Sequence, residues 1–216
     1  MAAIGALVLI PVAIALTFFY APVDEDGLNQ KIFYFHVPIA LTAYACFGWG
    51  AWKGLQHLWK GKPGADLESY VAIHLGVIFG AMTLITGSLW AKYRWGHWWL
   101  WSEKQLVLFL TLFLFYCAYF MLRFSLEEGR RRSRSSAVYA LFGVVLIPVS
   151  FLAIRLAEGF IHPTVFKRNP EISGSIFATF LVSWAAVTLL AYVLYRVELA
   201  GKRLDADLRE LREVLQ

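Results

Sequence analysis

The sequence has few cysteines, few charged residues and no nucleotide-binding loop. Its two cysteines, Cys46 and Cys117, stand without a CxxC spacing, so they support neither a thioredoxin-like site nor a zinc site. Charged residues make up 16% of the 216 positions and hydrophobic residues 59%, whereas soluble domains carry about 25% charged residues. The GxxxxGK[ST] pattern that cradles ATP phosphates is absent, so any ATP hydrolysis must come from a partner.

Long uncharged stretches account for most of the chain and predict its fold. Six windows contain no Asp, Glu, Lys or Arg, and each has about the 18 to 24 residues that cross a hydrocarbon core as a helix. Because lipid offers no hydrogen bonds to the backbone, these stretches must be helical. We therefore predict an all-α polytopic membrane protein, a single six-helix bundle over residues 1–196. The windows are Ala2–Tyr20, Ile32–Trp52, Tyr70–Ala91, Gln105–Leu122, Ser135–Ile154 and Ile172–Tyr195.

The two ends of the chain allow further interpretation. Ala2–Tyr20 could be a cleaved signal peptide, but it lacks a basic segment before the apolar one and is long enough to span. Residues 197–216 have charges between leucines at a helical spacing, which predicts an amphipathic cytoplasmic tail on the membrane or against a partner. Those leucines are Leu199, Leu204, Leu208, Leu211 and Leu215.

Basic residues predict the orientation of the bundle. With the N-terminus inside, 13 of the 20 Lys and Arg residues fall in inner segments, so the positive-inside rule predicts that both termini are cytoplasmic. The net charge of +5 is then a topology signal, and no nucleic-acid site is inferred from the arginines at 130–134. The inner residues are Lys53, Lys60, Lys62, Arg123, Arg130, Arg131, Arg132, Arg134, Arg196, Lys202, Arg203, Arg209 and Arg212.

A tryptophan-rich segment lies in the predicted outer loop at residues 91–104. Five of the nine tryptophans fall within twelve residues, from Trp90 to Trp101. Indole rings present large, rigid apolar faces, which suit stacking against a planar ligand such as a porphyrin. The competing interpretation is an aromatic belt at the membrane surface, although belt tryptophans are usually spread over several helix ends.

Three of the five histidines, His36, His97 and His162, fall on the predicted outer side. Neutral imidazole is a common ligand of haem iron, and two imidazoles can complete its coordination. Pro38 fits the first turn of a helix, so we expect His36 just outside that helix, pointing into the outer vestibule. Pro163 restrains the backbone of His162 toward an extended form. We expect His97 to contact a propionate or support the site instead of ligating iron.

The other two histidines lie toward the predicted inner side. His57 is expected to be a solvated loop residue. His74 is an ionisable residue at membrane depth, which makes it a functional candidate, but a hydrogen-bonded packing role is favoured because no second inner histidine faces it.

The segments 31–38, 95–101 and 161–163, in this order on six helices, resemble the CcmC haem-handling family of cytochrome c maturation. That family belongs to the wider group with a WGxWWxWD loop, which includes CcmF and CcsA. The resemblance implies His36 and His162 as axial ligands of haem b, with a platform formed by Trp95, Gly96, Trp98, Trp99 and Trp101.

The resemblance also concerns charged groups around the loop. Lys31 and Lys104 match basic positions of the family, which implies pairing with haem propionates, although interfacial snorkelling would also place lysines there. The family pattern ends in Asp, whereas this chain has Ser102 followed by Glu103. A role that needs an acid at that position is therefore in doubt.

The resemblance implies a delivery component and not an enzyme. Haem would be held at the periplasmic face of the bacterial inner membrane and passed to a CcmE-type haem chaperone. CcmA and CcmB of an ABC transporter, the small membrane protein CcmD and membrane lipid would be the other partners. Two alternatives stay open: a haem lyase-like component that attaches haem to apocytochrome c, and a b-type cytochrome with paired histidines at membrane depth. A lyase of this group is expected to be larger than six helices.

Overall fold

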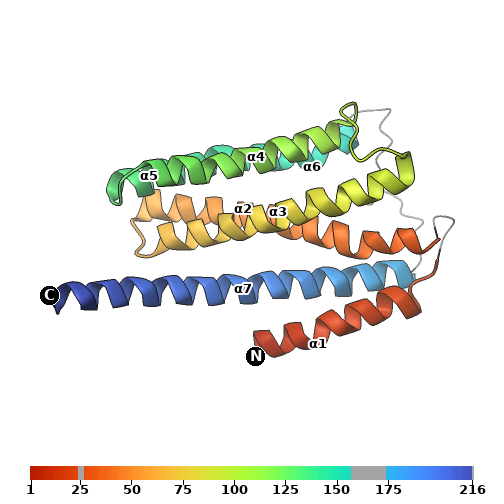
Figure 1. Cartoon of the computed structure of the whole chain (residues 1–216), viewed down its shortest axis with the longest axis horizontal. Coiled ribbons are helices and arrows are strands. Elements are labelled where there is room, and N and C mark those ends of the chain that lie inside the picture. Colours follow the sequence, from red (N-terminus) through yellow and green to blue (C-terminus); the bar gives the residue numbers. More distant parts are fainter. Residues whose placement is uncertain (24–26, 157–173, 216) are drawn as a thin grey trace.

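The computed structural model describes residues 1–23, 27–156 and 174–215, and every regular element within them is a helix. The predicted all-α class is therefore confirmed for this part of the chain (Figure 1). The elements are α1 (Ala2–Ala15), a π-helical turn (Leu16–Tyr20), a 3-10 helix (Gly27–Ile32), α2 (Phe33–Lys60), α3 (Ala65–Trp95), α4 (Lys104–Ser125), α5 (Arg130–Val144), α6 (Leu146–Leu156) and α7 (Gly174–Val214).

Six helical segments are long and apolar enough to cross a membrane, as the six uncharged windows predict. The fifth of these, Arg130–Leu152, is interrupted where α5 ends and α6 begins. Pro148 explains the break, because it has no N–H and its ring clashes with the carbonyl group four residues earlier, at Val144. The chain tightens here, and the Val145 N–H bonds to the Phe142 carbonyl at 3.3 Å.

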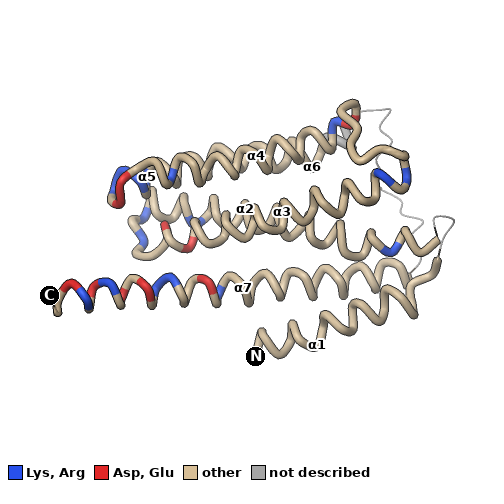
Figure 2. Tube along the Cα trace, in the orientation of Figure 1, with Lys and Arg blue, Asp and Glu red and all other residues tan. Residues whose placement is uncertain are grey.

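The helices run side by side, so the bundle has two distinct ends (Figure 1). We call the end that holds the connection between α3 and α4, residues 96–103, the tryptophan end; the predicted outer loop at 91–104 is too long, because residues 91–95 are the last turn of α3 and Lys104 begins α4. The opposite end holds the turns at 61–64 and 126–129, and we call it the basic end. Figure 2 shows lysine and arginine gathered at the basic end and along the last part of α7. α7 ends beyond the basic end, whereas α1 begins about half-way along the bundle and runs to the tryptophan end.

The last helix continues past the predicted boundary between bundle and tail. α7 runs unbroken from Gly174 to Val214, across residues 196–197. Leu199 is buried, whereas Leu204, Leu208 and Leu211 are exposed. The amphipathic segment is thus an extension of a spanning helix.

Close contact between α2 and α3 depends on glycine. A Cβ on Gly76 would lie 2.5 Å from Cδ1 of Phe47, and one on Gly50 would lie 2.5 Å from Cγ1 of Ile73. Phe47 is fully buried and stacks on Tyr116 of α4, with ring centroids 4.0 Å apart and planes at 4°. The missing side chain at Gly76 therefore lets α2, α3 and α4 share one aromatic core.

We expect Gly76→Ala to lower the free energy of unfolding by about 1–3 kcal/mol, because the added methyl group overpacks Phe47. Thermal melting of the detergent-solubilised protein, followed by circular dichroism, measures this change. Gly48→Ala is the matched control, since a Cβ there meets nothing within 4 Å. Equal melting temperatures for the two variants would contradict this account of the helix contact.

Candidate functional site

The tryptophan loop begins after α3 with a turn at Gly96. α3 ends at Trp95, and Gly96 follows with φ +77°, a left-handed conformation that glycine adopts without a steric cost. The Gly96 N–H bonds to the Lys92 carbonyl at 3.1 Å, and Lys92 Nζ donates to the Gly96 carbonyl at 3.0 Å. Both contacts hold the start of the loop against the last turn of α3.

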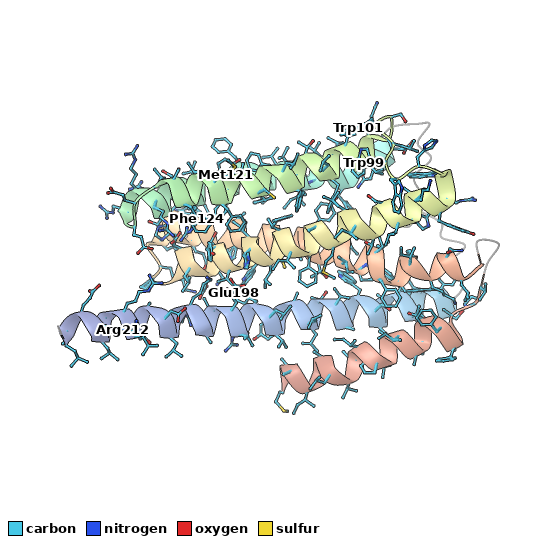
Figure 3. All side chains as sticks on the ribbon, in the orientation of Figure 1. Trp99, Trp101, Met121, Phe124, Glu198 and Arg212 are labelled. Carbon is cyan, nitrogen blue, oxygen red and sulfur yellow. The ribbon has the colours of Figure 1, made fainter. Side chains whose placement is uncertain are left out.

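Indole rings cover the surface of this loop. Trp98 and Trp101 are 57% and 73% exposed, while Trp95 and Trp99 are half-buried. Trp99 and Trp101 meet edge to face with centroids 5.8 Å apart, and Figure 3 shows both in the connection between α3 and α4. Large rigid apolar faces are thus held in the open at the end of the bundle.

One polar atom of this platform is buried without a partner. The indole nitrogen Nε1 of Trp99 is inaccessible to solvent and has no hydrogen-bond acceptor among the described residues. A buried N–H without an acceptor costs free energy, and because no solvent reaches this one, a ligand on the loop surface would meet it only after the Trp99 side chain moves.

His36 lies inside a helix, so the prediction that it stands just outside one is wrong. It is the fourth residue of α2, which begins at Phe33, and the 3-10 helix Gly27–Ile32 leads directly into it. Pro38 is therefore not in the first turn. The missing N–H of Pro38 removes only one backbone bond near the start of α2, which the helix tolerates. The half-buried imidazole contacts Thr86 of α3 through Nδ1.

The His36 ring is held against one turn of α3. Its Nδ1 lies 2.9 Å from Oγ1 of Thr86, and Oγ1 also lies 2.8 Å from the Met82 carbonyl oxygen. A Cβ on Gly87 would stand 3.0 Å from Cε1 of the ring. The same face of α3 carries Trp90, which is three residues beyond Gly87 and four beyond Thr86. Trp95 follows at about 14 Å from Thr86 along the helix axis.

The lysines expected near haem propionates differ in their surroundings. Lys31 is 2% exposed, and its Nζ donates to the carbonyl groups of Ala21 and Pro22 at 2.6 and 3.1 Å. This amine therefore holds the chain after α1 against the start of α2, a role the sequence did not predict. Lys104 is exposed at the first position of α4, next to the tryptophan loop.

Glu103, which follows the position where the family has Asp, turns inward. Glu103 is 3% exposed and is the N-cap residue of α4, with its carbonyl accepting the Leu106 N–H at 3.1 Å. Ser102 and His97 are exposed on the loop. A ligand on the loop surface would therefore meet Ser102 and His97 before the Glu103 side chain.

His162, the second predicted iron ligand, lies outside the described residues. Its connection leaves α6 after Leu156 and enters α7 at Gly174. Both helix ends lie at the tryptophan end of the bundle in Figure 1.

His74 is far from this site and is hydrogen-bonded, as expected for a packing role. Its Nδ1 lies 2.9 Å from Oε1 of Glu198 on α7, and its ring stacks on Tyr70 with centroids 6.2 Å apart. The prediction that His57 is a solvated loop residue is wrong, because His57 lies within α2, near its end at the basic end, and is half-buried.

Sequence reasoning missed Thr86 and Gly87. Both precede Trp90 by about one helical turn, so helix geometry places them on the same face of α3 as a tryptophan of the predicted site. That spacing was the sequence feature that could have pointed to them. Their partner His36 is 50 residues away from Thr86, and no spacing along the chain indicates that contact.

Comparison with known proteins agrees with these features. A family model described as CcmC, heme exporter protein C, matches residues 1–212. The chain is 32% identical over 157 residues to heme exporter protein C of Escherichia coli strain K12, covering 71% of this chain and 62% of that protein. It is also similar to heme exporter protein C of Bradyrhizobium diazoefficiens, at 29% over 195 residues, or 89% of this chain and 74% of that protein. With heme exporter protein C of Rhodobacter capsulatus it shares 29% identity over 197 residues, 88% of this chain and 81% of that protein.

Proposed function

The chain belongs to the CcmC, heme exporter protein C, family, and from this premise we propose that it presents haem at the tryptophan end of its bundle and passes it to a chaperone. It spans about 62% of the length of the Escherichia coli relative, so substrate and partners are part of the proposal. The proposed recipient is a CcmE-type haem chaperone, and the proposed partners in the membrane are CcmA, CcmB and CcmD. Haem is the cargo of this protein, and the proposed form is haem b.

The contact between His36 and Thr86 carries the proposal. It engages Nδ1, so Nε2 is the nitrogen through which His36 would ligate iron. The proposed second axial ligand is His162. The porphyrin would be covered by the indole faces of Trp95, Trp98, Trp99 and Trp101. The turn at Gly96 would fix the position of the three loop tryptophans relative to Trp95 at the end of α3.

Polar groups beside the platform support the same ligand. The Lys104 ammonium group and the His97 ring, both exposed in or beside the loop, would meet the propionates. Lys31 is left out of the proposed site because backbone carbonyl groups already accept its ammonium protons. Exposure of Trp98 and Trp101 would let a partner protein reach the bound haem.

The proposed orientation follows from charge. Lysine and arginine gather at the basic end (Figure 2), so the positive-inside rule favours that end in the cytoplasm. The tryptophan end would then face the periplasm.

Replacing the exposed tryptophans by alanine tests whether the platform binds haem through its indole rings. We expect Trp98→Ala and Trp101→Ala each to weaken haem binding by roughly 2- to 10-fold, because each removes one aromatic contact. Titration of the purified full chain with haem, followed by its optical spectrum, measures the affinity. Trp59→Ala is the control, since Trp59 is 80% exposed at the basic end. Absence of haem binding by the unaltered chain, even with the chaperone added, would reduce the loop to an interfacial belt or a docking surface.

A further inference from the structure

We propose that Thr86 is a positioning residue that fixes the tautomer and direction of the His36 imidazole, so that Nε2 is the nitrogen presented to haem iron. This inference rests on the proposed function, because it assumes His36 as a ligand. It concerns a residue of α3 that would touch neither haem nor its iron.

The hydrogen bonds of Thr86 favour one placement of its proton. Its hydroxyl group has one proton, and the Met82 carbonyl oxygen stands 2.8 Å from Oγ1, four residues earlier in α3. Threonine hydroxyl groups in helices commonly donate to that carbonyl. Thr111 makes the equivalent bond to Val107 at 2.8 Å, and Thr83 makes it to Phe79 at 2.9 Å. With its proton used in this way, Thr86 Oγ1 is an acceptor toward His36.

His36 is consequently the donor in the bond to Thr86. A neutral imidazole carries one proton, and placing it on Nδ1 leaves Nε2 with the lone pair that a metal requires. The second nitrogen of metal-binding histidines is usually bound in this way by an acceptor, which orients the ring and raises its basicity. Thr86 supplies that acceptor at 2.9 Å.

Gly87 constrains the same ring from a second direction. A Cβ there would stand 3.0 Å from Cε1, 3.7 Å from Nδ1 and 3.8 Å from Nε2 of His36. The imidazole thus lies against bare helix backbone, within reach of the neighbouring hydroxyl group. A side chain at position 87 would press on the ring that Thr86 holds.

Thr86→Val tests the role because valine keeps the branched shape and removes the hydroxyl group. We expect haem affinity to fall about 10-fold or more, the usual range for loss of a group that orients a metal-binding histidine. Thr86→Ser keeps the hydroxyl group and should bind haem like the unaltered chain. Thr111→Val is the matched control, since it removes the same type of helix bond at an exposed position of α4.

A second measurement needs no haem. Nitrogen NMR of the full chain with labelled histidine reports the tautomer of His36, assigned by its loss in His36→Ala. We expect the Nδ1–H form in the unaltered chain and in Thr86→Ser, and a mixture of tautomers in Thr86→Val. Gly87→Ala is an independent variant that should displace the ring and weaken haem binding while leaving the hydroxyl group in place. Its control is Gly48→Ala, where a Cβ meets nothing within 4 Å.

The outcomes separate the two proposals. Unchanged haem binding in His36→Ala would overturn His36 as a ligand, and with it the proposed function. If His36→Ala loses haem but Thr86→Val keeps full affinity and a single tautomer, only the role of Thr86 is overturned. Should Thr86→Val fail to fold, Thr86→Ala removes the same hydroxyl group with a smaller side chain, and full haem affinity with a single His36 tautomer in that variant would contradict the role of Thr86.

Discussion

His36→Ala is expected to lower the affinity of the purified chain for haem by at least about 100-fold. The proposed iron bond disappears with the imidazole, and this exceeds the roughly 10- to 100-fold effect of losing a group that only orients a ligand. The optical spectrum should change as well, because the number of axial nitrogen ligands falls. Haem titration of the detergent-solubilised protein, with spectra of the oxidised and reduced forms, measures both effects.

Three other histidines make this experiment specific. His162→Ala is expected to give a comparable loss if the second ligand comes from the connection between α6 and α7. His57→Ala is the matched control at the basic end, and it should bind haem like the unaltered chain. His97→Ala, at an exposed loop position, should cost no more than a few-fold in affinity. A full loss in His97→Ala with none in His36→Ala would reassign the iron ligand to the loop.

Arg123→Met is expected to lower the free energy of unfolding by about 3 kcal/mol. Arg123 of α4 binds Asp66 of α3 through two hydrogen bonds, at 2.8 and 2.6 Å, and its side chain is 7% exposed. The same guanidinium group lies over the ring of Tyr70, 5.0 Å from the centroid. Methionine fills similar space but leaves the Asp66 carboxylate without its cation, and breaking a buried pair in this way costs about 3–5 kcal/mol. The lower value applies because Asp66 is 26% exposed.

Melting followed by circular dichroism measures this loss, and two further variants interpret it. Glu128→Gln removes the pair between Glu128 and Arg132, in which the Glu128 side chain is 81% exposed, and should cost less than about 1 kcal/mol. Arg123→Met combined with Asp66→Leu should recover part of the loss, because no charge is then left unpaired. If Arg123→Met alone is as stable as the unaltered chain, the pair of Arg123 and Asp66 does not hold α3 to α4.

Some parts of the site could be read from the sequence and others could not. The tryptophan platform was predictable, because its residues are neighbours in the chain and Gly96 marks the turn after α3. The environment of His36 was not, since Pro38 indicated a helix start and the structure begins α2 five residues before that proline. Lys31 was assigned to a haem propionate because it matches a basic position of the family, whereas its ammonium group donates to backbone carbonyl groups ten and nine residues earlier.

The sequence by itself determined the class of the fold and the six spans. Apolar stretches of this length leave the backbone no hydrogen-bond partners except its own, so helices follow from composition alone. Only the tertiary structure decided which side chains meet between helices: His36 with Thr86, Arg123 with Asp66 and His74 with Glu198. Each of these contacts joins residues at least 50 positions apart. Spacing along one helix defines its faces, but packing of whole helices selects the partner that each face receives.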